Sequence, residues 1–282
     1  GINYGTASNF SCSNSLGLLT TMLINGIDKT SDKGLNIVRG AGSYMFNCSY
    51  AGNQNYSASS QQVYYTINKN SPTSGMSISG TTPITYGAIS NFAGSETNTG
   101  DADCVYSLDK PNMIYGAGTW TFNYSTAGCI NYSAGSVMGS LVVNKINSQT
   151  SLTFDKISPQ NYGNSIIPTC SVISGQGSPV LQMNSLTINS GQTLTLGAGS
   201  YMFNCSYAGN QNYSASNNVS NFIINQASVS LSLTATQSWN VVNPTQTTIT
   251  GSECPSQLSC NLYRNNAAVI NPDIQTLTVG TY

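Results

Sequence analysis

The sequence contains no histidine and very little charge. Eight Lys and Arg residues and nine Asp and Glu residues make up 6% of the 282 residues, and the formal net charge is −1. Ordinary soluble domains carry roughly 25% charged residues. Histidine is the side chain most used as a catalytic base and metal ligand, and a nucleic-acid-binding surface needs clustered cations. We therefore expect neither an enzyme nor a nucleic-acid-binding protein.

Long apolar runs are also missing, so the sequence predicts no membrane-spanning helix within this chain. The few carboxylates are scattered, and the tightest set is Glu96, Asp101 and Asp103. We interpret this set as a solvated loop. A weak calcium site is the alternative, because calcium binds several oxygen ligands at once. No other metal or cofactor is predicted.

Internal repeats are the clearest pattern that the sequence contains. Residues 40–59 are identical to residues 197–216, and residues 116–135 are a close variant of both. The first residues of the same block return at 279–282. The blocks recur about every 80 residues, which is the size of a small β-sandwich. An earlier landmark also recurs, as the pairs Tyr4-Gly5, Tyr86-Gly87 and Tyr162-Gly163.

Short segments rich in Thr, Val, Ile, Tyr and Phe lie between clusters of Gly, Asn, Pro and Ser, which is typical of β-strands joined by turns. We predict an all-β fold of tandem β-sandwich domains. Their predicted bounds are 1–69 (repeat one), 70–147 (repeat two), 148–226 (repeat three) and 227–282 (repeat four). Because the linkers around residues 67–72, 143–149 and 224–227 are short, we expect the domains to form a rod.

The two terminal repeats are incomplete in sequence. Residues 73–83 of repeat two have no counterpart before Gly1, and repeat four stops where its last two strands are expected. Two interpretations remain open. The chain is a window on a longer array, or subunits complete one another by strand donation.

The block Gly42–Ser59 resembles the ends of the immunoglobulin-like domain repeats of bacterial and archaeal cell-surface proteins, and its Asn-Tyr-Ser version is more similar to archaeal members. The resemblance covers three of the repeats. It implies immunoglobulin-like β-sandwiches in an adhesin stalk, an S-layer component or a surface filament. Paired cysteines and low charge depart from the common members.

The eight cysteines fall two per repeat, without any Cys-x-x-Cys motif, which favours disulfides over a metal site. The predicted bridges are Cys12–Cys48, Cys104–Cys129, Cys170–Cys205 and Cys254–Cys260. In repeat two both cysteines occupy positions different from those of repeats one and three. Stable disulfides require an oxidising compartment, so we expect an extracellular protein.

The glycosylation acceptor pattern Asn-x-Ser/Thr is also frequent. It occurs at Asn9, Asn47, Asn55, Asn123, Asn131, Asn204, Asn212 and Asn218. If Cys48 faces the core, its neighbour Asn47 faces solvent, because alternate residues of a strand share a face. Asn123 and Asn204 follow by alignment, and Asn55, Asn131 and Asn212 lie in the turn before the last strand. We expect N-linked glycans at these positions without disturbance of packing.

Together these features predict a structural cell-surface glycoprotein, the building unit of an extracellular filament, sheath or S-layer, with copies of itself as partners. One alternative is the stalk of an adhesin whose binding head lies outside this chain. Another is a carbohydrate- or calcium-binding accessory module.

Overall fold

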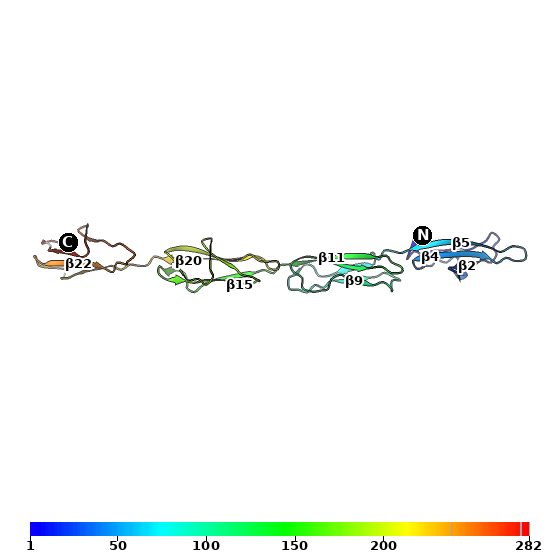
Figure 1. Ribbon diagram of the computed structural model, residues 1–282, viewed down its shortest axis with the longest axis horizontal. Coiled ribbons are helices and arrows are strands. Elements are labelled where there is room, and N and C mark those ends of the chain that lie inside the picture. Colours follow the sequence, from blue (N-terminus) through cyan, green and yellow to red (C-terminus); the bar gives the residue numbers. More distant parts are fainter. Residues whose placement is uncertain (238, 277, 282) are drawn as a thin grey trace. The chain divides into compact units, whose positions relative to one another are not determined.

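The computed structural model describes residues 1–237, 239–276 and 278–281; Ser238, Leu277 and Tyr282, all within the predicted repeat four, lie outside the described residues. Apart from one short 3-10 helix at Thr30–Asp32, the regular elements of the described residues are β-strands (Figure 1). The predicted all-β class is confirmed. None of the described helices is long and apolar enough to cross a membrane.

The chain divides into two compact units. The first contains Gly1–Ser148 together with Ser174–Gln176 and Ala208–Ser216, and the second contains the remaining residues. The first unit therefore holds repeats one and two and also the end of a hairpin from repeat three. The predicted bounds of the four domains stay a prediction.

Repeat one forms a five-stranded sheet in the order β1-β5-β4-β2-β3. Its strands are β1 (Ile2–Asn3), β2 (Thr21–Ile24), β3 (Ile27–Asp28), β4 (Gly42–Tyr50) and β5 (Ser59–Asn68). Met22, Ile24 and Phe46 form the buried core together with Cys12. Phe10 covers this core, with its ring stacked on Phe46 at 3.9 Å between centroids.

Repeat two has two sheets, in the orders β7-β11-β10-β9 and β6-β8. Its strands are β6 (Met76–Ser79), β7 (Ile84–Thr85), β8 (Ala93–Glu96), β9 (Tyr106–Leu108), β10 (Gly118–Thr126) and β11 (Gly135–Asn144). The core is built on Phe92, Phe122 and Leu141. The rings of Phe92 and Phe122 stack at 4.6 Å.

Repeat three has sheets in the orders β13-β20-β19-β16-β17, β12-β15 and β14-β18. Its strands are β12 (Gln149–Phe154), β13 (Gln160–Asn161), β14 (Ser165–Ile166), β15 (Pro168–Ser174), β16 (Val180–Met183), β17 (Leu186–Ile188), β18 (Leu194–Thr195), β19 (Gly199–Tyr207) and β20 (Ser216–Asn225). Phe203, Phe222 and Leu181 lie at the centre of the core.

Repeat four has sheets in the orders β21-β22-β25 and β23-β24. Its strands are β21 (Ser232–Ala235), β22 (Gln246–Ser252), β23 (Leu262–Arg264), β24 (Ala267–Val269) and β25 (Asp273–Thr276). The equivalent of β23 in repeat three is β16, which pairs with both β17 and β19. Within the described residues, β23 pairs with β24 alone.

A long antiparallel hairpin is the common feature of repeats one to three: β4–β5, β10–β11 and β19–β20. Each hairpin is extended by a short strand that pairs in parallel with its second strand, such as Ile2 with Ile67 and Ile84 with Val143. Alternation along the first strand directs one large residue inward in each repeat, because successive side chains point to opposite faces. These residues are Phe46, Phe122 and Phe203, all buried.

Candidate functional site

The most detailed recurring feature of the structure is the contact between one repeat and the turn of the next repeat's long hairpin. We call these turns tip one (residues 51–58), tip two (127–134) and tip three (208–215). Each contains a glycine with a positive φ, at +84° for Gly52, +89° for Gly128 and +78° for Gly209. A Cβ at Gly209 would lie 2.7 Å from the carbonyl oxygen of Tyr213, so the turn requires glycine both for its backbone angle and for its closeness.

The opposite end of each repeat presents a receptor end made of three features. They are the tyrosine of the recurring Tyr-Gly pair (Tyr4, Tyr86 or Tyr162), the alanine of the Gly-Ala-Gly sequence before the long hairpin, and the linker residue two positions after the hairpin's last strand. The backbone N–H of the landmark tyrosine donates to an asparagine carbonyl of the hairpin, at 2.9 Å for Tyr4 and Tyr86 and 2.8 Å for Tyr162.

An aromatic side chain holds the Gly-Ala-Gly sequence in all three receptor ends. Tyr44 donates its hydroxyl to Gly40 O at 2.7 Å, and Tyr201 donates in the same way to Gly197 O at 3.0 Å. In repeat two the indole nitrogen of Trp120 takes this role, donating to Gly116 O at 2.9 Å. The receptor end is therefore shaped within each repeat.

We call the contact between a tip and the receptor end of the preceding repeat a joint. At the first joint, tip two docks on the receptor end of repeat one. The linker residue Asn70 donates its N–H to Asn131 O at 2.9 Å and accepts from Ser133 N–H at 2.9 Å. Ala41 donates its N–H to Asn131 Oδ1 at 3.0 Å. The ring of Tyr132 packs edge-on against Tyr4, with 5.5 Å between centroids.

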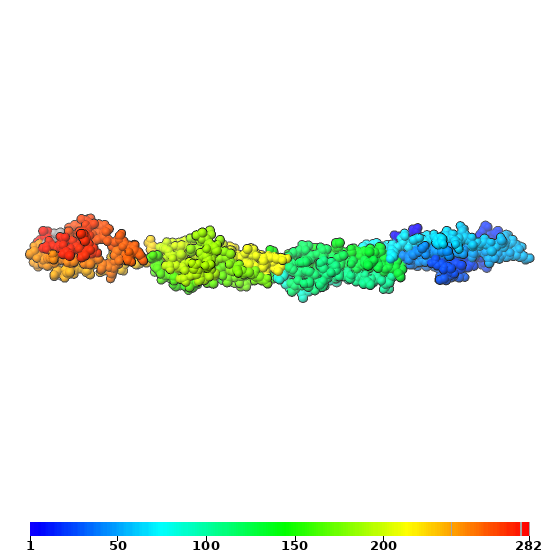
Figure 2. Space-filling model, viewed as in Figure 1, coloured from blue at the N-terminus to red at the C-terminus, as the bar shows by residue number. Residues whose placement is uncertain are grey.

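At the second joint, tip three makes the same contacts with repeat two, all within the first compact unit. Ile146 exchanges two backbone hydrogen bonds of 2.9 Å with Asn212 O and Ser214 N–H. Ala117 donates its N–H to Asn212 Oδ1 at 2.9 Å, and the rings of Tyr86 and Tyr213 lie 6.0 Å apart. In Figure 2 this turn is the yellow surface that meets the green end of repeat two.

Two lysines occupy equivalent linker positions beside these joints. Lys69 donates its ammonium to Cys129 O, and Lys145 donates to Asn210 O. Each ties a linker to the tip that follows it. Both lysines stand directly after the last strand of their hairpin, β5 or β11, so their spacing follows the repeat.

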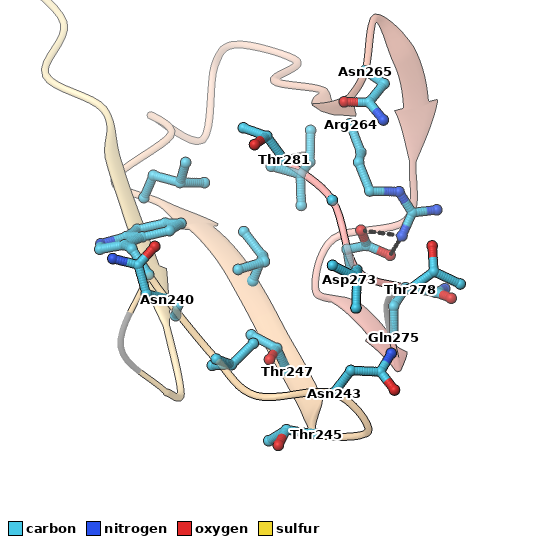
Figure 3. Close-up of a pocket in the computed structure, with 18 of the residues that line it drawn as sticks. Asn240, Asn243, Thr245, Thr247, Arg264, Asn265, Asp273, Gln275, Thr278 and Thr281 are labelled. Carbon is cyan, nitrogen blue, oxygen red and sulfur yellow. Dashed lines mark hydrogen bonds and ion pairs between the residues drawn. The ribbon is translucent and has the colours of Figure 1, made fainter.

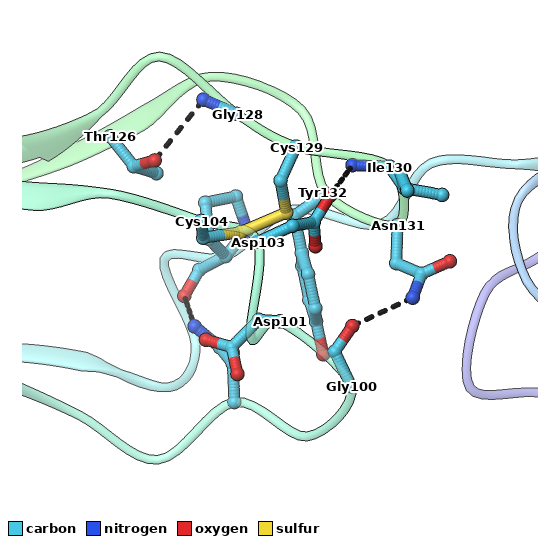
Figure 4. The surroundings of a disulfide bond; sticks show 12 residues. Gly100, Asp101, Asp103, Cys104, Thr126, Gly128, Cys129, Ile130, Asn131 and Tyr132 are labelled. Carbon is cyan, nitrogen blue, oxygen red and sulfur yellow. Dashed lines mark hydrogen bonds between the residues drawn. A yellow bond between two sulfur atoms is a disulfide. The ribbon is translucent and has the colours of Figure 1, made fainter.

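The disulfide of repeat two lies at the first joint (Figure 4). Cys129 belongs to tip two, and its bond to Cys104 fastens the tip to the loop of residues 99–104. Asn131 Nδ2 donates to Gly100 O at 2.7 Å in this loop. The hydroxyls of Tyr132 and Tyr4 both donate to Thr99 O, at 3.0 and 3.2 Å. The displaced cysteine pair thus anchors a loop that takes part in the joint.

The other three bridges have different surroundings. Cys12–Cys48 and Cys170–Cys205 join equivalent positions across the cores of repeats one and three, with sequence separations of 36 and 35. Cys254–Cys260 closes a short loop in repeat four. All four bridges lie within repeats.

The joints correct the expectation that glycans at all the tip asparagines would leave packing undisturbed. Both polar atoms of the Asn131 side-chain amide are hydrogen-bonded: Oδ1 accepts from Ala41 N–H, and Nδ2 donates to Gly100 O. Asn212 Oδ1 accepts from Ala117, and a Cβ at Gly116 would lie 3.2 Å from that oxygen. An N-linked glycan is attached at Nδ2, so on Asn131 it would compete with the bond to Gly100 O, and on either residue it would stand next to an Oδ1 that is held in a joint. Asn55, in tip one, is exposed.

The asparagines at mid-strand also differ from the expectation of a solvent-facing side chain. Asn47, Asn123 and Asn204 lie on the outer face, yet each is half-buried and its Oδ1 is buried without a hydrogen-bond partner. On the flanking strands, Met138 pairs across from Asn123, and Gln182 pairs across from Asn204. Asn9 and Asn218 are exposed, and Asn9 Nδ2 donates to Gly34 O at 2.8 Å.

The three carboxylates of the calcium alternative are each engaged separately. Asp101 accepts from the Tyr106 hydroxyl at 2.8 Å, Asp103 from Ile130 N–H at 2.9 Å, and Glu96 from Asn98 N–H at 2.9 Å. Burial, aided by the bond to Asp101, raises the pKa of Tyr106 to about 12. Among the described residues, the group of potential metal ligands is Asp103 with Cys104 and Cys129, and these two sulfurs are joined to each other.

Repeat four contains a cavity of about 390 Å³ between its two sheets (Figure 3). Leu233, Trp239 and Leu262 line it, and Trp239 is 64% exposed. Arg264 reaches across to Asp273, with 3.0 Å between guanidinium nitrogen and carboxylate oxygen. The cavity borders β23, whose counterpart in repeat three pairs with the long hairpin.

No family model matches the chain, and no curated protein matches it. Among solved structures, the chain shows a distant likeness to fibronectin(III)-like modules of CbhA from Clostridium thermocellum. The likeness has 9% identity and a TM-score of 0.23, and it covers 53% of this chain and 95% of that one. The strands and sheets described above make the chain an all-β protein with several sheet domains.

Proposed function

We propose that this chain is a structural, non-catalytic protein of the extracellular surface, a glycosylated building unit of a filament, sheath or S-layer. The single observation that carries the proposal is the joint. It occurs twice with equivalent residues in equivalent hydrogen bonds, which is the arrangement expected of a part whose repeats must keep a fixed relation to one another.

The disulfides support the extracellular setting. Each repeat has its own bridge, and structural disulfides persist in oxidising surroundings. With 6% charged residues, the surface offers little repulsion between copies. Glycans on the exposed Asn9, Asn55 and Asn218 would keep such a surface soluble while leaving the two joints intact.

Electron microscopy of the protein on its native cells, located with an antibody, tests the proposal. We expect label along continuous filaments or sheets. Label confined to short projections that end in a separate domain would instead support the adhesin stalk. If no label were found on the cell surface and the protein were recovered inside the cell, the extracellular role would be refuted.

A further inference from the structure

Repeats one, three and four each contain a short hairpin that repeat two lacks. These hairpins are β2–β3, β16–β17 and β23–β24. The equivalent strand of repeat two is β9, which pairs with β10 and ends its sheet. Among the described residues, no strand pairs with the other edge of β9. An open strand edge is a template for pairing with another chain.

The local sequence explains why this hairpin is missing. In repeats one and three the hairpin turn begins at Asn25 and Asn184, whose φ angles are +49° and +47°. The register of the strands places Pro111 at the same position, and a proline ring fixes φ near −65°. The chain instead crosses toward the other sheet, where Asn112 accepts from Phe92 N–H and donates to Phe92 O, both at 2.8 Å. Residues within repeat two therefore leave the edge open.

Alternation along β9 decides which backbone groups the open edge presents. Asp109 N–H donates to Asn123 O of β10 at 3.0 Å. Asp109 and Ser107, two residues before it, thus direct their backbone groups toward β10, because alternate residues of an antiparallel pair share one direction. The N–H and C=O groups of Tyr106 and Leu108 point the other way, out of the sheet.

The equivalent backbone groups of repeat one are bonded within the repeat. Met22 is the counterpart of Leu108 in the strand register. Its carbonyl accepts from Lys29 N–H at 2.8 Å, and its N–H donates to Thr30 Oγ1 at 3.0 Å. The outward groups of Leu108 have no such partner in the part of the chain that the structure describes.

We propose that β9 pairs with β9 of a second copy of this chain, antiparallel and about a two-fold axis at Ser107. Each Tyr106 then lies opposite the partner's Leu108, and the outward N–H and C=O groups of these residues exchange hydrogen bonds. The two Ser107 residues face each other, with Cα atoms about 4.5 Å apart. A two-fold contact joins copies in pairs. The proposal rests on the assembly role proposed above and names one contact through which copies join.

The apolar side chains of β9 favour a second copy as the occupant. Tyr106 and Leu108 are half-buried on the inner face of the sheet, where the ring of Tyr106 stacks on that of Tyr124 at 5.8 Å. In the pair, each Tyr106 gains the partner's Leu108 as a cross-strand neighbour. Ser107, on the outer face, is exposed and small enough to face its own copy.

The charges at the two ends of β9 are also complementary to a second copy. Lys110 follows the strand and the exposed Asp103 precedes it. Antiparallel pairing places Lys110 opposite the partner's Cys104, beside the partner's Asp103, so opposite charges meet twice in the pair. Lys110 already donates to Asp109 and to Thr121 O, and an ammonium group has a third N–H to donate.

Cross-linking of the whole 282-residue chain tests the pairing directly. Ser107→Cys should form a disulfide between position 107 of two chains, because the expected Cα separation lies within the range that a disulfide spans. Peptide mapping by mass spectrometry identifies that link and checks that Cys104–Cys129 is retained. Thr119→Cys is the matched control, because Thr119 is exposed on the same face of the sheet but lies outside the contact.

Charged variants test the same contact without a covalent bond. Ser107→Lys places two ammonium groups opposite each other, so association in sedimentation velocity should weaken about tenfold or more. Thr119→Lys adds the same charge and should associate like the unchanged chain. Asp103→Asn keeps an oxygen for Ile130 N–H and removes a charge, so it should reduce the salt dependence of association. Thermal melting confirms that the variants remain folded.

Amide exchange identifies the edge that pairs. At high protein concentration, the N–H groups of Tyr106 and Leu108 should gain protection, whereas that of Ser107, which already faces β10, should change little. Equal protection of these three groups at low and high concentration would overturn the pairing.

Two further results would also overturn it. One is a Ser107→Cys chain that forms no more dimer than Thr119→Cys, and the other is equal association of Ser107→Lys and Thr119→Lys. Either result would leave the assembly role standing, through another surface. Failure of the assembly role would be seen separately, as native cells without labelled filaments or sheets.

Discussion

Removal of the tyrosine ring from one joint should loosen that joint and leave the other unchanged. Tyr132 is 5% exposed, packs against Tyr4 and donates a hydrogen bond of 3.0 Å to Thr99 O. An aromatic pair contributes about 0.5–1.5 kcal/mol beyond its buried area, and a hydrogen bond contributes about 1 kcal/mol. We therefore expect Tyr132→Ala to lower the free energy of opening the first joint by about 2 kcal/mol.

Amide hydrogen exchange measures this directly, because the N–H of Asn70 is held by Asn131 O across the joint. A change of about 2 kcal/mol corresponds to a roughly thirtyfold loss of protection at Asn70. The equivalent reporter at the second joint is the N–H of Ile146. Its protection should stay the same in Tyr132→Ala.

The matched variant is Tyr213→Ala, which should lower the protection of Ile146 and spare Asn70. Tyr132→Phe keeps the ring and loses the hydroxyl, so its effect at Asn70 should be smaller than that of the alanine variant. If both alanine variants changed both reporters equally, the joints would not be local contacts and the reasoning would fail. Unchanged protection at Asn70 in Tyr132→Ala would refute the role of the ring.

Three further outcomes can be measured by thermal or chemical denaturation. Gly209→Ala should destabilise tip three by about 1–3 kcal/mol, because φ is +78° and the added Cβ would meet backbone; Gly5→Ala, with a φ of +91° and open space around it, is the milder control. Replacing both Cys170 and Cys205 by Ala should cost about 4 kcal/mol in the loop-entropy account, against about 2 kcal/mol for the shorter Cys254–Cys260 loop; equal losses would contradict that account. The pKa of Tyr106 is raised from 10.0 to about 12 in the folded chain, so the unfolded chain loses this proton first and the free energy of unfolding should fall between pH 10 and 12. Tyr106→Phe should remove that part of the pH dependence. The same pH profile in Tyr106→Phe as in the unchanged chain would contradict this role of Tyr106.

The sequence by itself determined the strand class and the repeat length. Alternating apolar residues bounded by Gly, Asn and Pro indicate strands because side chains alternate across a sheet. The structure places Phe46, Phe122 and Phe203 inward at the positions where that alternation directs them. Two cysteines per repeat were enough to indicate one bridge per repeat, and the structure joins those pairs.

What the repeated asparagines do depended on tertiary structure. Periodicity assigned Asn131 and Asn212 to turns, and a turn in an isolated domain faces solvent. Only the packing of one repeat against the next shows that both amides bind a neighbouring alanine N–H. A signal was present in the sequence, since Gly-Ala-Gly and Asn-Tyr-Ser recur together in repeats one to three. It could not be interpreted because the contact pairs one repeat's alanine with the next repeat's asparagine, some 90 residues further along.

The outer face of the strands shows the same limit. Parity alone decides which face a side chain takes, so it assigned Asn47, Asn123 and Asn204 outward. Parity does not tell how far neighbouring residues cover that face, and in all three cases Oδ1 is buried. The sequence therefore determined the strands, the bridges and the repeat, because these follow from local pattern and count. Tertiary structure alone decided the joints and the covered asparagines, because both arise from segments far apart in the chain.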